Sequence, residues 1–163
     1  MDMRHNRVRK WTADKSKEAW GGKVLEERPV GPPQVKTPGR MDVIARREGV
    51  QTLIDVVVSS VATDVRREQE RRAREPGRSL RTAEARKLAC YGEGVLAVAV
   101  EDTGRLGAGT MRLLRDWAEC QDDLPPDVEY RRLAVELQHV VLSGTASMLQ
   151  ISRGVAPSLA WVR

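Results

Sequence analysis

Residues 52–58, Thr-Leu-Ile-Asp-Val-Val-Val, place one aspartate inside an apolar segment that is rich in β-branched side chains. Segments of this length and composition form strands that are buried on both faces of a sheet. An isolated ionised carboxylate is expensive to bury, so the fold must bring a cation, a proton or a metal ion to Asp55. No other sequence feature limits the fold as strongly.

The strand that precedes it adds a second carboxylate. Residues 42–45 form another short apolar strand, and the Arg-Arg-Glu-Gly-Val segment that follows is typical of a hairpin loop. If the turn centres between Glu48 and Gly49, Asp42 lies directly opposite Asp55. Opposed side chains of an antiparallel pair share one face of the sheet, with Cβ atoms about 4.5–5.5 Å apart. A shift of one residue in the loop would change this partner.

A lysine is predicted to face the same site. Successive residues of a helix are rotated by about 100°. In the helix predicted over residues 80–91, this rotation places Lys87 in a stripe about 80° wide whose other side chains are mostly apolar. A lysine in such a stripe either extends to solvent or pairs with a buried anion. The residues of the stripe are Leu80, Ala83, Lys87 and Tyr91.

Two carboxylates and a lysine suit phosphodiester hydrolysis assisted by Mg²⁺ or Mn²⁺. Asp42 and Asp55 would hold the metal, and Lys87 would stabilise charge on the phosphate. Glu26 or Glu27, on the short strand after the first helix, could add a third carboxylate. The alternative is a purely structural ion pair between the lysine and a core aspartate.

The remaining pattern predicts an α/β or α+β domain, with a small mixed sheet flanked by helices. We assign residues 1–22 to its N-terminal helix, 23–120 to its core, and 121–163 to a linker and a C-terminal helical extension. The apolar stripe of that extension either packs back on the domain or faces a partner. The other expected features are a helix over 4–20, a strand over 23–26 broken at 29–33, Ser79 as a helix N-cap, a strand over 95–100, a turn at Glu101-Asp102 and a helix over 109–120.

Composition excludes several classes of protein. No apolar run approaches the roughly 20 residues of a membrane span, and the first residues lack the apolar core of a signal peptide. The chain has two cysteines and two histidines, His5 and His139, so neither a Cys-x-x-Cys zinc site nor a histidine-ligated metal cluster can form. Any metal is expected to be a hard ion held by carboxylates.

The positive charge is concentrated in one part of the chain. There are 28 Lys and Arg against 23 Asp and Glu, and many of the arginines lie between residues 64 and 87 with acids among them. Such a stretch either contacts phosphates or is a solvated charged surface. With no Phe, four Trp and two Tyr, a base-stacking platform is not indicated. The arginines assigned to nucleic-acid binding are Arg66, Arg67, Arg71, Arg72, Arg81 and Arg86.

Three segments together resemble a known family. They are Arg-Met-Asp-Val-Ile-Ala-Arg at 40–46, Gly-Val-Gln-Thr-Leu-Ile-Asp-Val-Val-Val-Ser-Ser at 49–60, and Ala-Glu-Ala-Arg-Lys-Leu-Ala-Cys-Tyr-Gly-Glu at 83–93. They are similar to the restriction-endonuclease-like, PD-(D/E)xK-type domain of site-specific non-LTR retrotransposons and related reverse-transcriptase open reading frames. Segments 4–9 and 98–107 extend the similarity over most of residues 4–120.

The resemblance implies a restriction-endonuclease-like fold and a nuclear, Mg²⁺- or Mn²⁺-dependent endonuclease that nicks one strand of DNA, with a retroelement reverse transcriptase as a further partner. By position, it implies that Asp42 and Asp55 bind the metal and that Lys87 and Tyr91 serve catalysis. Glu26 or Glu27 corresponds to the family's acid near the end of the first helix.

The chain departs from the family pattern in three ways. Met41 stands where the family has a proline, and Val57 stands where familiar nucleases of this fold carry their lysine. Neither a reverse transcriptase nor a Cys/His knuckle precedes the domain, so the chain looks like a detached fragment of a retroelement. A catalytically inactive DNA-binding or interaction module, or a non-functional remnant, are the alternatives.

Overall fold

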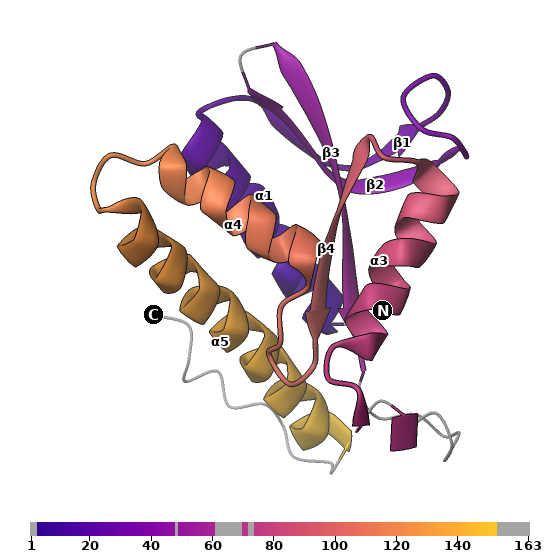
Figure 1. Cartoon of the computed structure of the whole chain (residues 1–163), viewed down its shortest axis with the longest axis vertical. Helices are drawn as coiled ribbons and strands as arrows, with labels where there is room; N and C mark the ends of the chain where they lie inside the picture. Colours follow the sequence, from indigo (N-terminus) through magenta and orange to yellow (C-terminus); the bar gives the residue numbers. More distant parts are fainter. Residues whose placement is uncertain (1–2, 48, 61–69, 72–73, 153–163) are drawn as a thin grey trace.

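The structure is a computed structural model that describes residues 3–47, 49–60, 70–71 and 74–152. Among the described elements, three strands follow the first helix directly, and the last two elements are both helices (Figure 1). In order, the elements are α1 (Met3–Trp20), β1 (Val24–Val30), β2 (Gly39–Arg47), β3 (Val50–Ser59), α3 (Arg78–Tyr91), β4 (Val95–Glu101), α4 (Ala108–Glu119) and α5 (Pro126–Ser152).

The four strands form one mixed sheet in the order β1-β2-β3-β4. Strands β1, β2 and β3 are antiparallel neighbours, whereas β4 pairs parallel to β3. A parallel pair needs a crossover connection, and α3 lies within it. The predicted mixed α/β class is therefore confirmed.

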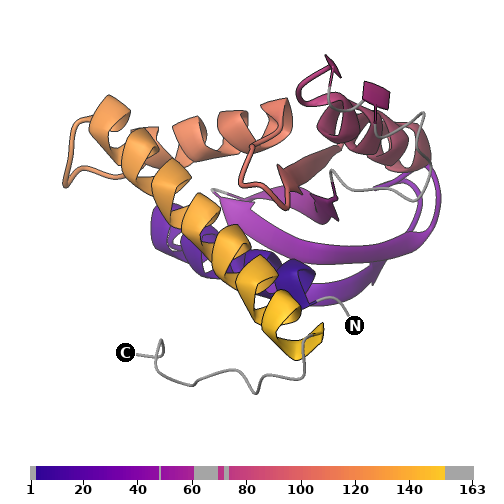
Figure 2. The same cartoon turned by 90° about the horizontal axis from the view of Figure 1, so that it is seen from below.

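Helices cover both faces of the sheet. Helices α1, α4 and α5 lie on one side and α3 on the other (Figures 1 and 2). The larger core lies between the sheet and the three helices. At its centre, Trp117 is fully buried, and its ring meets those of Trp11 and Trp20 edge to face, with centroids 5.8 and 6.0 Å apart. A smaller core under α3 contains Met41, Ile44, Leu53 and Val95.

Helix α5 belongs to the larger core. Its Leu133, Leu137 and Val141 are fully buried, and the helix packs along α1 and α4 (Figure 2). On the opposite side of the same helix, Val135 remains 64% exposed. Of the two possibilities left open by the sequence, packing back on the domain is the one observed.

Two local expectations are wrong, and one strand is longer than expected. Strand β1 runs past the predicted residues 23–26 and ends at Val30, within the break predicted at 29–33; it includes Pro29 because an edge strand tolerates a residue without an N–H group. Ser79 is not the N-cap of α3: it lies in the first turn, and its hydroxyl donates to Glu101 Oε1 at 2.6 Å. Glu101 is not a turn residue but the buried last residue of β4.

Within the described residues, no helix combines the length and the apolar character needed to cross a bilayer.

Candidate functional site

Strands β2 and β3 stop pairing at Asp42. Their ladder runs from the Arg47–Val50 pair to the Val43–Ile54 pair, which is the register expected from the sequence. At the next position, Asp42 Oδ2 accepts a hydrogen bond of 2.7 Å from the backbone N–H of Val56. The side chain of Asp42, rather than the backbone of β2, therefore satisfies this amide.

Asp55 lies in the middle of β3 and is 3% exposed. Its carboxyl group interacts directly with that of Asp42. Burial raises the pKa of Asp55, Lys87 opposes this, and the charge of Asp42 raises it again, so the pKa lies above its ordinary value. Burial also raises the pKa of Asp42, but hydrogen bonds from His5 and from the Val56 amide outweigh it, and that pKa is lowered. Two carboxylates that share a site separate their pKa values in this way, so Asp55 is the more readily protonated of the two.

Lys87 reaches the pair from α3, as its helical position predicted. Its Nζ forms an ion pair with Asp55 Oδ2, and its side chain is 27% exposed. The ammonium group also lies 5.7 Å from the centroid of the Tyr91 ring. The Tyr91 ring packs on the backbone of Gly39, where an added Cβ atom would lie 2.7 Å from Cε1. Tyr91 therefore anchors the end of α3 over the start of β2.

His5, which was not assigned to the site from the sequence, enters from the other face of the sheet. It lies on α1, and its Nε2 is 3.2 Å from Asp42 Oδ2 and 3.2 Å from the carbonyl oxygen of Val56. The hydrogen bond with Asp42 raises the pKa of His5, although burial opposes this. The available sequence signal was its place one turn before the buried Val8. His5, Asp42, Asp55 and Lys87 thus form a continuous row from α1, through the sheet, to α3.

The structure does not bring Glu26 or Glu27 to the two aspartates. Glu27 Oε1 lies 2.7 Å from Arg9 NH1, and Glu26, which is 41% exposed, lies 3.8 Å from Arg9 Nε. In the part of the chain that the structure describes, no three Asp, Glu, His or Cys side chains stand together as a ready set of metal ligands.

The arginines assigned to nucleic-acid binding are only partly described. Arg66, Arg67 and Arg72 lie outside the described residues. Arg71, Arg81 and Arg86 are exposed, and Arg81 NH1 donates to the carbonyl oxygen of Pro76 at 3.2 Å.

The donor set of Asp42 and Asp55 fits a hard divalent cation. Both supply carboxylate oxygens, which Mg²⁺ and Mn²⁺ prefer, and water or phosphate oxygens would complete the coordination. A cation between the two carboxylates would relieve the repulsion between their charges. Lys87, next to this position, adds a positive charge that can face a phosphate.

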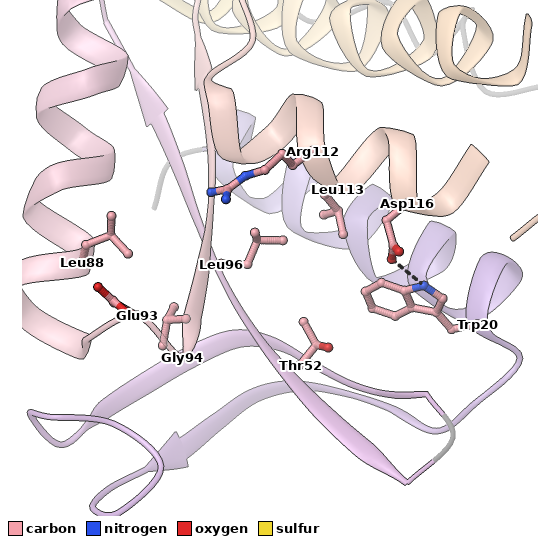
Figure 3. Close-up of a pocket in the computed structure, with 10 residues that line it drawn as sticks. Trp20, Thr52, Leu88, Glu93, Gly94, Leu96, Arg112, Leu113 and Asp116 are labelled. Atoms are coloured by element: carbon pink, nitrogen blue, oxygen red, sulfur yellow. Dashed lines mark hydrogen bonds between the residues drawn. The ribbon is translucent and has the colours of Figure 1, made fainter. Parts of the chain in front are cut away.

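A hollow of about 630 Å³ lies elsewhere, between the C-terminal end of α3, the start of β4 and α4. Trp20 Nε1 donates to Asp116 Oδ2 at 3.1 Å on one wall, and Arg112 lies on another (Figure 3). Arg47 NH1 also donates to Asp116 at 3.2 Å. The lining includes neither Asp42, Asp55 nor Lys87, so this hollow is separate from the candidate site.

Comparison of the chain with models of known protein families and with curated proteins found no match.

Proposed function

We propose that the chain is a metal-dependent DNA endonuclease domain of the restriction-endonuclease-like type, related to non-LTR retroelements, that nicks one strand of DNA. One observation carries the proposal. Two aspartates from neighbouring strands and a lysine from α3 meet at one buried position. Paired carboxylates of this kind need a proton or a cation between them, and phosphodiester cleavage uses such a cation.

Each residue has a separate role in this proposal. Mg²⁺ or Mn²⁺, when bound, supplies Lewis-acid stabilisation of the phosphate and a water of lowered pKa. Asp42 and Asp55 would hold the ion, and His5 orients Asp42 through its hydrogen bond. Lys87 now neutralises Asp55, and a cation at the carboxylates would leave its ammonium group available to a phosphate oxygen. Tyr91 holds α3, and therefore Lys87, against the sheet.

The architecture supports the proposal without deciding it. A mixed sheet with helices on both faces is what the resemblance implies. One fold hosts many functions, so the weight rests on the side chains of the site.

A metal-independent DNA-binding module is the second candidate, and the closed network of charges favours it. Asp42 is paired with His5, and Asp55 is paired with Lys87. A network in which each charge has a partner persists without a metal ion.

Nicking of supercoiled plasmid separates the two candidates. The full chain is incubated with Mg²⁺, Mn²⁺ or EDTA, beside Asp55→Asn and the control Asp14→Asn, which alters an exposed acid of α1 paired with Lys10. A nuclease nicks only with metal, loses nicking in Asp55→Asn and keeps it in Asp14→Asn. If the folded protein never nicks but binds DNA equally with and without metal, the DNA-binding module is correct instead.

A further inference from the structure

The sheet face that carries Asp55 also has a basic hollow over β1 and β2. Helix α3 packs mainly on β3 and β4. Beside it lies a hollow of about 420 Å³, with Leu25 and Ile44 among its apolar residues. Three cations line it, and we call it the Arg46 hollow after one of them: Lys23, Arg28 and Arg46.

The positive charge of the Arg46 hollow is uncompensated. Among the residues that the structure describes, no acidic residue lines it. Among the described residues, no ion pair involves Lys23, Arg28 or Arg46, and all three are exposed. Other arginines nearby are paired: Arg9 and Arg40 with Glu27, and Arg47 with Asp116. A concave surface with three unpaired cations, and no acid among its described lining residues, attracts a polyanion.

Strand register fixes the distance between this hollow and the candidate site. Arg46 donates its backbone N–H to Lys23 O at 3.3 Å and pairs with Gln51 across β2 and β3, so the three form one row across the sheet. Asp42 and Asp55 each lie four residues further along their strands, which is about 13 Å at about 3.3 Å per residue. Alternation along β3 places Gln51 and Asp55 on the same face.

That spacing is short enough for one nucleic-acid strand to reach from the hollow to the candidate site. Lys23, the residue before β1, and Arg28 within β1 are five residues apart, or about 16 Å, which favours a chain of phosphates over one isolated phosphate. The apolar side chains of Leu25 and Ile44 offer a surface for the sugars between them.

We propose that the Arg46 hollow binds backbone phosphates of the nucleic-acid strand whose reacting phosphate lies at Asp42 and Asp55. The inference rests on the proposed function, which supplies the nucleic-acid substrate. It assigns the phosphate contacts to this face of the sheet and not to the arginine-rich stretch that the sequence indicated.

Two charge-matched triple variants of the full chain test the inference. One is Lys23→Gln/Arg28→Gln/Arg46→Gln, and the control is Arg71→Gln/Arg81→Gln/Arg86→Gln. Affinity for a fluorescent DNA duplex is measured by anisotropy in EDTA over a range of NaCl concentrations, so that neither metal nor cleavage contributes. The slope of log K against log salt is negative, and each lost phosphate contact makes it shallower by about 0.9. We expect the slope to become shallower by about 2 to 3 in the first variant and by less than about 1 in the control.

Further arms identify the ligand and guard against misfolding. Inorganic phosphate should displace no more DNA than NaCl does at equal ionic strength. If it displaces more, the hollow binds a small anion and the inference is wrong. The variant Lys23→Arg/Arg28→Lys/Arg46→Lys should retain the wild-type slope. If the Gln triple variant does not fold, the single exposed variant Arg46→Gln should still make the slope shallower by about 0.9.

The two proposals fail in different ways. Absence of DNA binding by the wild-type chain would overturn the proposed function together with this inference. Normal binding by the Lys23/Arg28/Arg46 variant, with a loss in the control, would overturn the inference alone and return the contact to the arginine-rich stretch.

Discussion

His5 Nε2 lies 3.2 Å from Asp42 Oδ2, and this contact joins α1 to the point where β2 stops pairing with β3. Both side chains also meet Val56, whose amide donates to Asp42 and whose carbonyl oxygen lies 3.2 Å from His5 Nε2. The histidine and the β3 backbone therefore fix the orientation of the Asp42 carboxylate.

The first prediction concerns the pKa of His5 in the metal-free protein. The hydrogen bond with Asp42 holds it above the ordinary value of 6.5. Asp42→Asn keeps an acceptor for the Val56 amide but removes the charge, so the pKa of His5 should fall. An NMR titration of the imidazole measures this, with Asp14→Asn as the control. An unchanged pKa in Asp42→Asn would contradict the contact.

The same pair sets a pH window for stability. The pKa of His5 is raised, so its contribution is complete below about 6.5 and is lost as the pH rises through the raised value. The pKa of Asp42 is lowered, so its contribution is present above about 3.8 and is lost as the pH falls through the lowered value. Urea denaturation should show the largest deficit of Asp42→Asn between these limits.

The second prediction concerns the ion pair between Lys87 and Asp55. Lys87→Met leaves a buried carboxyl group unpaired, which should lower the free energy of unfolding by about 1–3 kcal/mol. Since Lys87 lowers the pKa of Asp55, its loss raises that pKa further, and the deficit should grow as the pH rises through it. Denaturation at about pH 5 and about pH 8 measures the difference.

The double variant Asp55→Asn/Lys87→Met is the control for that experiment. It removes both charges, so it should be more stable at neutral pH than Lys87→Met alone. A Lys87→Met deficit that does not change with pH would show that lost packing, rather than the unpaired carboxyl group, is the cause.

The third prediction tests the close approach of α4 to the sheet. A Cβ atom on Gly109 would lie 2.5 Å from the carbonyl oxygen of Ala97, and the Gly109 amide donates to Glu84 Oε1 at 2.8 Å. Gly109→Ala should therefore cost about 1–3 kcal/mol of stability. Gly31→Ala is the matched control, because no atom lies within 4 Å of the added methyl group. Equal melting temperatures for the two variants would contradict the observed packing.

The fourth prediction tests whether α5 is part of the core. Leu137 is fully buried, and Leu137→Ala should lower stability by about 2–5 kcal/mol. Val135, two residues earlier on the same helix, is 64% exposed, and Val135→Ala should change stability by less than about 0.5 kcal/mol. Chemical denaturation of both variants measures the difference. If α5 were not part of the core, Leu137→Ala would be as stable as Val135→Ala.

Only the tertiary structure placed several of the functional groups. His5 meets Asp42 because α1 packs across β2 and β3, and these segments are distant in the sequence. The sequence predicted a turn at Glu101, but in the structure this residue ends β4 and is buried against Ser79 of α3. The Arg46 hollow likewise depends on which part of the sheet α3 leaves uncovered.

What the sequence determined by itself was local. The apolar run around Asp55, the hairpin register and the position of Lys87 on one helical stripe were all readable, because strand and helix periodicities fix which face a side chain shares with its neighbours. Periodicity does not state which elements meet across that face. That choice follows from the packing of whole helices and strands against one another, and it brought the histidine of α1 to the aspartate of β2.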